Sequence, residues 1–179
     1  AARSTFGALF PARNQISQRV VLSEVPLKFE IPASEKHSLR VLVAVLSGRT
    51  NFKRRTLSRK TWIRLYNQRA FKRVSFDVIF VLGSRSCKTR KCKLEDERIQ
   101  AEKYRFQDMV ILKIEDKYRN SALKMLEFYT LAGETMFSYD CLLKLDDDSL
   151  PNLQAISRNL RHVYSLVKSK HTMWWWGDF

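Results

Sequence analysis

Residues 40–47 read Arg-Val-Leu-Val-Ala-Val-Leu-Ser, and this stretch decides the fold class. The run is apolar, rich in Val and bounded by Ser47-Gly48, which is typical of a buried β-strand. The segment 52–66 follows with apolar side chains at roughly helical spacing, at Leu57, Trp62, Ile63 and Tyr66. The order predicted is therefore a buried strand and then a helix.

The same alternation continues along the rest of the chain. Apolar runs predict strands over 74–82, 108–114 and 141–145, and helical spacing predicts helices over 94–104, 120–137 and 151–167. Ser149 is the expected N-cap of the last helix, with Pro151 in its first turn. Strands that alternate with helices predict an α/β fold, a largely parallel sheet with helices on both faces.

The N-terminal residues have a different character. Residues 1–36 show no clean period and carry three prolines, so we expect an arm or stem remnant there, with short strands over 20–22 and 27–31. The domain is expected over 37–179. With 179 residues, of which 45% are hydrophobic, the chain can bury one sizeable core. Its longest apolar runs are far shorter than the roughly 20 residues that cross a bilayer.

The net charge indicates the kind of partner, and the cysteine content indicates which disulfides are possible. The net charge is +15, which attracts nucleic acid, acidic membranes or other polyanions. A polyanion- or nucleic-acid-binding module is therefore an alternative function, although no zinc-finger spacing or RNA-binding aromatic signature accompanies the charge. Three cysteines are too few for a disulfide scaffold. Cys87 and Cys92 are compatible with either a loop disulfide or two free thiols.

Three consecutive carboxylates, at Asp146, Asp147 and Asp148, follow the last predicted strand. Ligands of parallel α/β sheets bind beyond the carboxyl ends of the strands. Adjacent anions repel one another, and a divalent cation compensates for this. On an extended segment Asp146 and Asp148 point the same way, so both can face one Mg²⁺ or Mn²⁺ ion that also takes substrate phosphates. The alternative is a solvated acidic turn that caps the next helix.

A basic stretch follows the first strand. Residues 49–73 carry ten Lys or Arg and no acidic residue. Arg55 and Arg59 lie four residues apart and share one helix face, where they could hold a diphosphate by forked hydrogen bonds. The alternative is a solvated helix face. Residues 85–93 add five more positive charges.

Five motifs in register over residues 40–152 resemble a known family. The segment from Arg54 to Trp62 resembles the Arg-Arg-x-x-x-Arg-x-Thr-Trp motif of the β1,3-glycosyltransferase (galactosyltransferase) family. The other matches are Phe80-Val81-Leu82-Gly83, Glu102 with Asp108, Asp116-x-Tyr118-x-Asn120 with Lys124, and Lys144-x-Asp146-Asp147-Asp148. The chain departs from the pattern at Ser121-Ala122, where the family usually has Leu-Thr. The segment 118–129 and the closing 175–179 are most similar to the N-acetylgalactosaminyltransferase branch.

The resemblance implies a GT-A fold that binds a UDP-sugar with Mn²⁺ or another divalent cation. It implies inverting transfer of a hexose or N-acetylhexosamine to a glycan or glycoprotein acceptor in β1,3 linkage, as in protein O-glycosylation, with no nucleic-acid partner. Asp148 and Asp146 are the expected metal ligands. The expected donor-site residues are Ser47, Arg55, Arg59, Asp116, Asn120, Lys124, Asp146 and Asp147.

The resemblance also places the protein in the cell. It implies a type II membrane protein of the Golgi or endoplasmic reticulum, with a lumenal catalytic part and an anchor that this chain does not carry. The family's presumed base, an acidic residue, lies well after the Trp-rich segment 174–176. We therefore expect this chain to be a truncated domain that holds the donor site, lacks the acceptor half and the base, and has no turnover alone.

Overall fold

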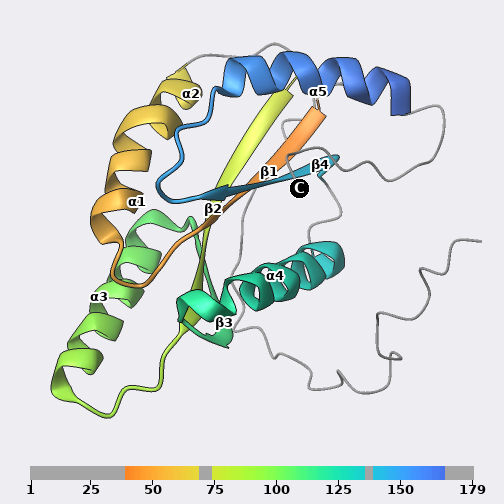
Figure 1. The fold of residues 1–179 in the computed structure, drawn as a ribbon. Helices are drawn as coiled ribbons and strands as arrows, with labels where there is room; N and C mark the ends of the chain where they lie inside the picture. The colour runs from red at the N-terminus through yellow and green to blue at the C-terminus, as the bar shows by residue number, and fades with distance from the viewer. Residues whose placement is uncertain (1–38, 69–73, 136–138, 168–179) are drawn as a thin grey trace, which may run out of the picture.

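The computed structural model describes residues 39–68, 74–135 and 139–167, and these form strands that alternate with helices (Figure 1). The strands are β1 (Leu39–Leu46), β2 (Val74–Ser84), β3 (Met109–Glu115) and β4 (Cys141–Asp146). The helices are α1 (Phe52–Ser58), the π-helical η1 (Arg59–Ile63), α2 (Arg64–Gln68), α3 (Arg90–Phe106), the 3₁₀ turn η2 (Tyr118–Asn120), α4 (Ser121–Thr135) and α5 (Leu153–Val167).

The four strands form one parallel sheet in the order β3-β2-β1-β4. Strand β1 lies inside the sheet, and its last residue, Leu46, stands opposite Val81 of β2 and Asp146 of β4. The carboxyl ends of these strands therefore share one edge of the sheet. Residues that follow them in the sequence are brought together at that edge, although they are up to 100 positions apart.

Helices cover both faces of the sheet, as the sequence predicts. Alternate residues of β1 point to opposite faces because the side-chain period of a strand is two. Val41, Val43 and Val45 pack in one cluster with residues of η1, α3 and α5. Leu42 and Ala44 pack in the other, against α4. Helices α4 and α5 accordingly lie on opposite sides of the strands (Figure 1). The α/β prediction is confirmed.

Local details differ from the predictions at helix ends. Ser149 is not the N-cap of α5, because the helix begins later and the side chain of Asn152 accepts the capping hydrogen bond from the Ala155 amide at 3.0 Å. The single helix predicted over 52–66 is interrupted by the π-helical η1. Cys87 and Cys92 form a disulfide, and Cys141 is a free thiol.

Several predictions fall on residues that the structure does not describe. These are the N-terminal arm over 1–36 with its two short strands, and the Trp-rich segment over 174–176. In the described ranges, the model contains no helix with the length and apolar character needed to cross a bilayer.

Candidate donor site

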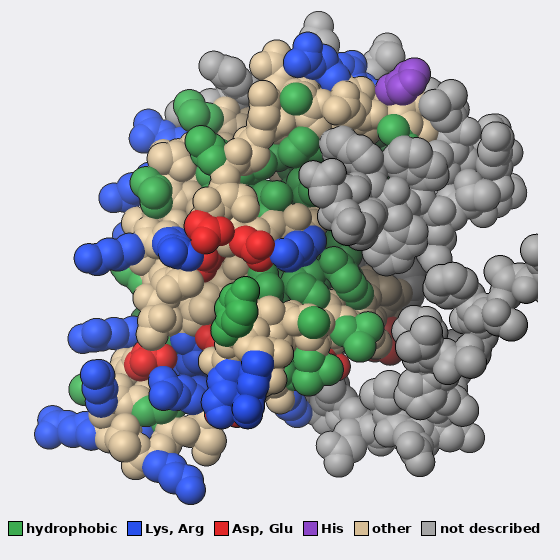
Figure 2. All heavy atoms as spheres, viewed as in Figure 1, with side chains coloured by type: hydrophobic (Ala, Val, Ile, Leu, Met, Phe, Trp, Pro, Cys, Tyr) green, Lys and Arg blue, Asp and Glu red, His purple; other side chains and the backbone are tan. Residues whose placement is uncertain are grey.

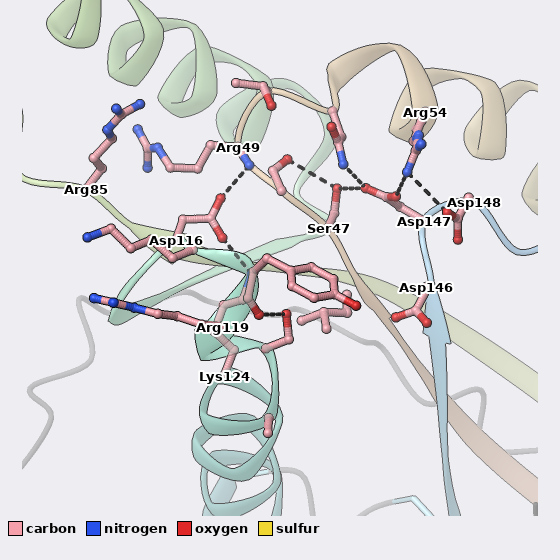
Figure 3. Close-up of a pocket in the computed structure, with 18 of the residues that line it drawn as sticks. Ser47, Arg49, Arg54, Arg85, Asp116, Arg119, Lys124, Asp146, Asp147 and Asp148 are labelled. Carbon is pink, nitrogen blue, oxygen red and sulfur yellow. Dashed lines mark hydrogen bonds and ion pairs between the residues drawn. The ribbon is translucent and has the colours of Figure 1, made fainter.

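A pocket of about 770 Å³ opens at the carboxyl-terminal edge of the sheet (Figure 3). Its walls come from the segments that follow β1, β2, β3 and β4, and from the start of α4. Six residues expected at the donor or metal site line it, namely Ser47, Asp116, Lys124, Asp146, Asp147 and Asp148. The convergence follows from the parallel register, because each of these segments leaves the sheet at the same edge.

Asp147 turns inward from the acidic segment, the residues 146–148 that end and follow β4. Its Oδ2 accepts hydrogen bonds from Ser47 Oγ at 2.6 Å and Asn51 Nδ2 at 2.8 Å, and its Oδ1 accepts one from Arg54 at 2.9 Å (Figure 3). Burial alone would raise the pKa of this carboxyl, but the hydrogen bonds from Ser47, Asn51 and Arg54 outweigh it and lower the pKa. Asp147 therefore anchors the acidic segment to β1 and α1 as a carboxylate.

The other two carboxylates of the acidic segment remain exposed. The Asp146 side chain is 52% exposed and that of Asp148 is 64% exposed. Each contacts one basic side chain, Lys144 Nζ at 2.9 Å from Asp146 and Arg54 at 3.3 Å from Asp148. The acidic patch on this face is flanked by basic side chains (Figure 2). Asp147 thus differs from its two neighbours, but β4 ends at Asp146 and residues 147–148 form a turn, so the difference does not come from the alternation of an extended strand.

The donor chemistry of this segment fits a divalent cation that takes part of its coordination from elsewhere. Asp146 and Asp148 offer hard carboxylate oxygens at the pocket wall, which suit Mg²⁺ or Mn²⁺. No group of three or more His, Cys, Asp or Glu side chains in the described ranges is arranged to hold an ion. An ion bound here would complete its coordination with water or phosphate oxygens, which is how these cations commonly bind at nucleotide sites.

Asp116 lies on the opposite wall, directly after β3. Its Oδ1 accepts from Lys124 Nζ at 2.6 Å, and its Oδ2 accepts from the Arg49 backbone amide at 2.6 Å. Asp116 lies this close to the end of β2 because Gly83 has no side chain. A Cβ at Gly83 would lie 2.6 Å from the Ile114 carbonyl oxygen and 2.8 Å from Asp116 Cα. The buried Lys124–Asp116 pair thus joins the start of α4 to the exits of β1 and β3.

Arg55 and Arg59 do not line the pocket, so the expectation that they hold a diphosphate does not match this geometry. Arg55 is fully buried, and all five of its N–H donors are used, two of them by Glu102 at 2.9 and 2.7 Å. Arg59 bridges Glu102 and Asp108. Burial would raise the pKa of Glu102, but hydrogen bonds from the two arginines lower it.

The buried arginine network still reaches the site. The Arg55 guanidinium donates to Ser47 Oγ at 3.0 Å, and Ser47 in turn donates to Asp147. Arg55 is therefore a positioning residue for the wall on which Asp147 is held. Asn120 is also outside the pocket lining, and its side-chain amide donates to the Glu115 carbonyl at 2.9 Å, which shapes the turn before α4.

Sequence reasoning missed several residues that line the pocket. They are Arg49, Asn51, Arg54, Arg85, Lys117, Tyr118 and Arg119. The signal was present, since each lies within eight residues of the end of a strand, but nothing in the spacing separates Arg54, which faces the pocket, from Arg55, which does not. Tyr118 is 96% exposed at the pocket rim. Arg85 and Arg119 lie across the pocket from the acidic segment (Figure 3).

The match to a family model and the matches to individual proteins agree on the class of protein that this chain resembles. The galactosyltransferase family model matches residues 53–173. The UDP-GalNAc:beta-1,3-N-acetylgalactosaminyltransferase 2 of Danio rerio is 33% identical over 97 residues, which are 54% of this chain and 19% of that protein. The Homo sapiens protein of the same name is 34% identical over 88 residues, 48% of this chain and 16% of that protein.

A third relative has a different name. The beta-1,3-galactosyltransferase bre-2 of Caenorhabditis elegans is 27% identical over 112 residues, 62% of this chain and 30% of that protein. The chain therefore matches less than a third of the length of each of these relatives. Because the family model covers more than half of the chain, including the acidic segment and Asp116, this chain belongs to the galactosyltransferase family.

Proposed function

We propose that this chain is the donor-binding part of an inverting β1,3-glycosyltransferase that uses a UDP-sugar and a divalent cation. The observation that carries the proposal is the position of the acidic segment. Two exposed carboxylates line a pocket of about 770 Å³ at the carboxyl ends of parallel strands, which is where α/β folds bind nucleotides. The family membership supports the same function.

In this proposal Asp148 and Asp146 hold Mn²⁺ or another divalent cation. Held there, the ion would supply positive charge beside the UDP leaving group. Asp147 holds the acidic segment in place, while Ser47, Asp116 and Lys124 form the walls against which the nucleotide lies. The exposed ring of Tyr118 offers a surface on which a base or sugar ring stacks.

The chemical outcome is transfer of a hexose or N-acetylhexosamine to an acceptor glycan or glycoprotein, in protein O-glycosylation. The acceptor hydroxyl oxygen forms a bond to the anomeric carbon, the bond from that carbon to the UDP oxygen breaks, and the hydroxyl proton passes to a base. We assign this base to no described residue, and we expect donor binding without turnover.

We place the protein in the Golgi or endoplasmic reticulum, with this part in the lumen. The Cys87–Cys92 disulfide supports this location, because disulfides persist in oxidising compartments.

Calorimetric titration of UDP into the folded chain, with and without Mn²⁺, tests the proposal. We expect binding that requires Mn²⁺ and is abolished by Asp148→Ala. The matched control is Asp140→Ala, which removes an exposed carboxylate before β4 rather than after it. UDP that fails to bind with Mn²⁺ present would favour the polyanion-binding alternative.

The donor sugar is tested by competition once UDP binding is established. We propose UDP-N-acetylgalactosamine as the first candidate, because relatives with that donor in their names match at 33–35% identity. A lower Kd for UDP-N-acetylgalactosamine than for UDP-galactose and UDP-N-acetylglucosamine supports it. A preference for UDP-galactose would instead agree with the name of the Caenorhabditis elegans relative.

A further inference from the structure

Both exposed carboxylates of the acidic segment contact a cation of the chain itself. The Arg54 guanidinium reaches from α1 to Asp147 at 2.9 Å and to Asp148 at 3.3 Å (Figure 3). Lys144, two residues before Asp146 on β4, contacts both oxygens of that carboxylate, at 2.9 and 3.0 Å. The two carboxylates best exposed for binding a divalent cation are therefore also those that Arg54 and Lys144 partly neutralise.

These contacts differ from the buried ion pairs of the same molecule. The side chains of Arg54 and Lys144 are 52% and 41% exposed, whereas that of Arg55 is completely buried. Exposed ion pairs contribute little to stability because solvent screens them and long side chains lose entropy when they are held. Arg54 can thus leave the exposed Asp148, and Lys144 the exposed Asp146, at small cost, whereas Arg55 is held by buried partners.

A divalent cation bound at Asp146 and Asp148 changes the electrostatic surroundings of Arg54 and Lys144. It repels the nearby positive charges and takes the carboxylate lone pairs that they use. A diphosphate brought by the same ion supplies new negative charge at the same wall of the pocket. Arginine in particular binds phosphate oxygens through its fork of N–H donors.

We propose that Arg54 and Lys144 are exchangeable counterions of the acidic segment. Without a divalent cation they neutralise Asp148 and Asp146, and they compete with the ion for these carboxylates. When the ion and the nucleotide are bound, they help to hold the diphosphate. This inference rests on the proposed function. It predicts that removing either basic side chain changes the affinities for Mn²⁺ and for UDP in opposite directions.

The test measures two affinities in Arg54→Ala. The first is the Kd of Mn²⁺ alone, followed by calorimetry, and we expect it to fall about two- to tenfold because a competing charge is gone. The second is the Kd of UDP at saturating Mn²⁺, which we expect to rise by a similar factor. Lys144→Ala is expected to change both affinities in the same directions.

Lys53→Ala is the matched control. Lys53 is the exposed neighbour of Arg54 on α1, and in the described part of the chain it forms no ion pair. It removes the same charge, so we expect both affinities to stay close to those of the unaltered chain. Equal changes in Lys53→Ala and Arg54→Ala would show that net charge alone is responsible, and the inference would be wrong.

Other outcomes also separate the inference from the proposed function. Weaker Mn²⁺ binding in Arg54→Ala would mean that Arg54 only holds the carboxylates in place, which overturns the inference. Tighter Mn²⁺ binding with no change for UDP overturns the diphosphate role. If the unaltered chain binds Mn²⁺ but not UDP, the proposed function fails, while the effect of Arg54→Ala on Mn²⁺ still decides whether Arg54 competes.

Discussion

Two adjacent arginines show how much the surroundings of a residue decide its role. Arg54 and Arg55 are consecutive on α1, yet Arg54 reaches the pocket and Arg55 is enclosed with Glu102. In the sequence both belong to one basic stretch. The charged partner of Arg55, Glu102, lies 47 residues away on α3, so only the folded chain reveals that the charge of Arg55 is already satisfied.

Arg55→Ala should destabilise the chain strongly. The substitution leaves Glu102 buried with one of its two arginine partners removed, and breaking a buried ion pair in this way costs about 3–5 kcal/mol of unfolding free energy. Urea denaturation followed by circular dichroism measures the loss. Lys53→Ala, which removes an exposed charge from the same helix, is the control, and its unfolding midpoint should stay nearly unchanged. Similar midpoints for Arg55→Ala and Lys53→Ala would contradict the structural role of Arg55.

The contribution of Asp147 to stability should depend on pH. Its pKa is lower in the folded chain than the ordinary value of 3.8, because hydrogen bonds from Ser47, Asn51 and Arg54 outweigh the effect of burial. The stabilisation is therefore complete above about pH 5 and is lost as the pH falls through the folded pKa.

Asp147→Asn tests this dependence. At pH 6 the unfolding free energy of the variant should be much lower than that of the unaltered chain. At pH 3 the difference should be smaller. A difference that stays constant between these pH values would show that the lost stability does not come from the carboxylate charge.

At the residue scale, sequence reasoning identified the acidic segment better than the basic residues. Consecutive carboxylates after a buried strand are a local signal, although the strand alternation expected for Asp146, Asp147 and Asp148 does not describe residues 147–148, which form a turn after β4. The roles of Arg55 and Arg59 depend on contacts with Glu102 and Asp108. In the family resemblance, the two arginines belong to one motif and Glu102 and Asp108 to another, and the motifs do not indicate that these side chains contact one another.

At the scale of elements, the close approach of β2 and β3 positions one wall of the pocket. The pairing shifts register between Gly83 and Ser84, and the amide of Asp116 then donates to the Ser84 carbonyl at 2.9 Å. Only a residue without a Cβ fits where Gly83 meets this backbone. The exit of β3, and with it Asp116, is therefore placed by the end of β2.

Gly83→Ala should displace Asp116. The added methyl group meets backbone atoms, which cannot turn away as a side chain can, so we expect a loss of about 1–3 kcal/mol in unfolding free energy and weaker UDP binding. Gly133→Ala in α4 is the control, since a Cβ there meets nothing within 4 Å and alanine favours a helix by about 1 kcal/mol. Unchanged UDP affinity in Gly83→Ala would show that Asp116 is not held in this way.

The interiors of the elements were predictable and their ends were less so. Apolar runs located all four described strands within two residues of their ends, because buried parallel strands require such runs. The cap of α5 was wrongly placed at Ser149, because Ser and Asn are both good caps and the sequence alone does not separate Ser149 from Asn152, which caps the helix. The π-helical η1 has no signature in the spacing of apolar residues.

For the whole molecule, the net charge of +15 predicts an additional, non-specific behaviour. Positive charge attracts polyanions by releasing counterions, so the chain should bind heparin at low salt and lose it as salt rises. Asp148→Ala should leave this binding unchanged, and Mn²⁺ should not be required. Heparin chromatography at increasing salt measures it. A heparin affinity that depends on Asp148 would mean that the pocket, rather than the overall charge, binds the polyanion.

The proposed function rests on the claim that the carboxyl ends of the parallel strands form a nucleotide site. A crystal structure of the chain with UDP and Mn²⁺ tests it most directly, because the anomalous signal of manganese locates the ion. We predict manganese bound to Asp148 and the diphosphate in the pocket between the acidic segment and Asp116. Nucleotide bound instead to the basic residues 85–93, or a pocket empty at saturating UDP and Mn²⁺, would contradict the claim.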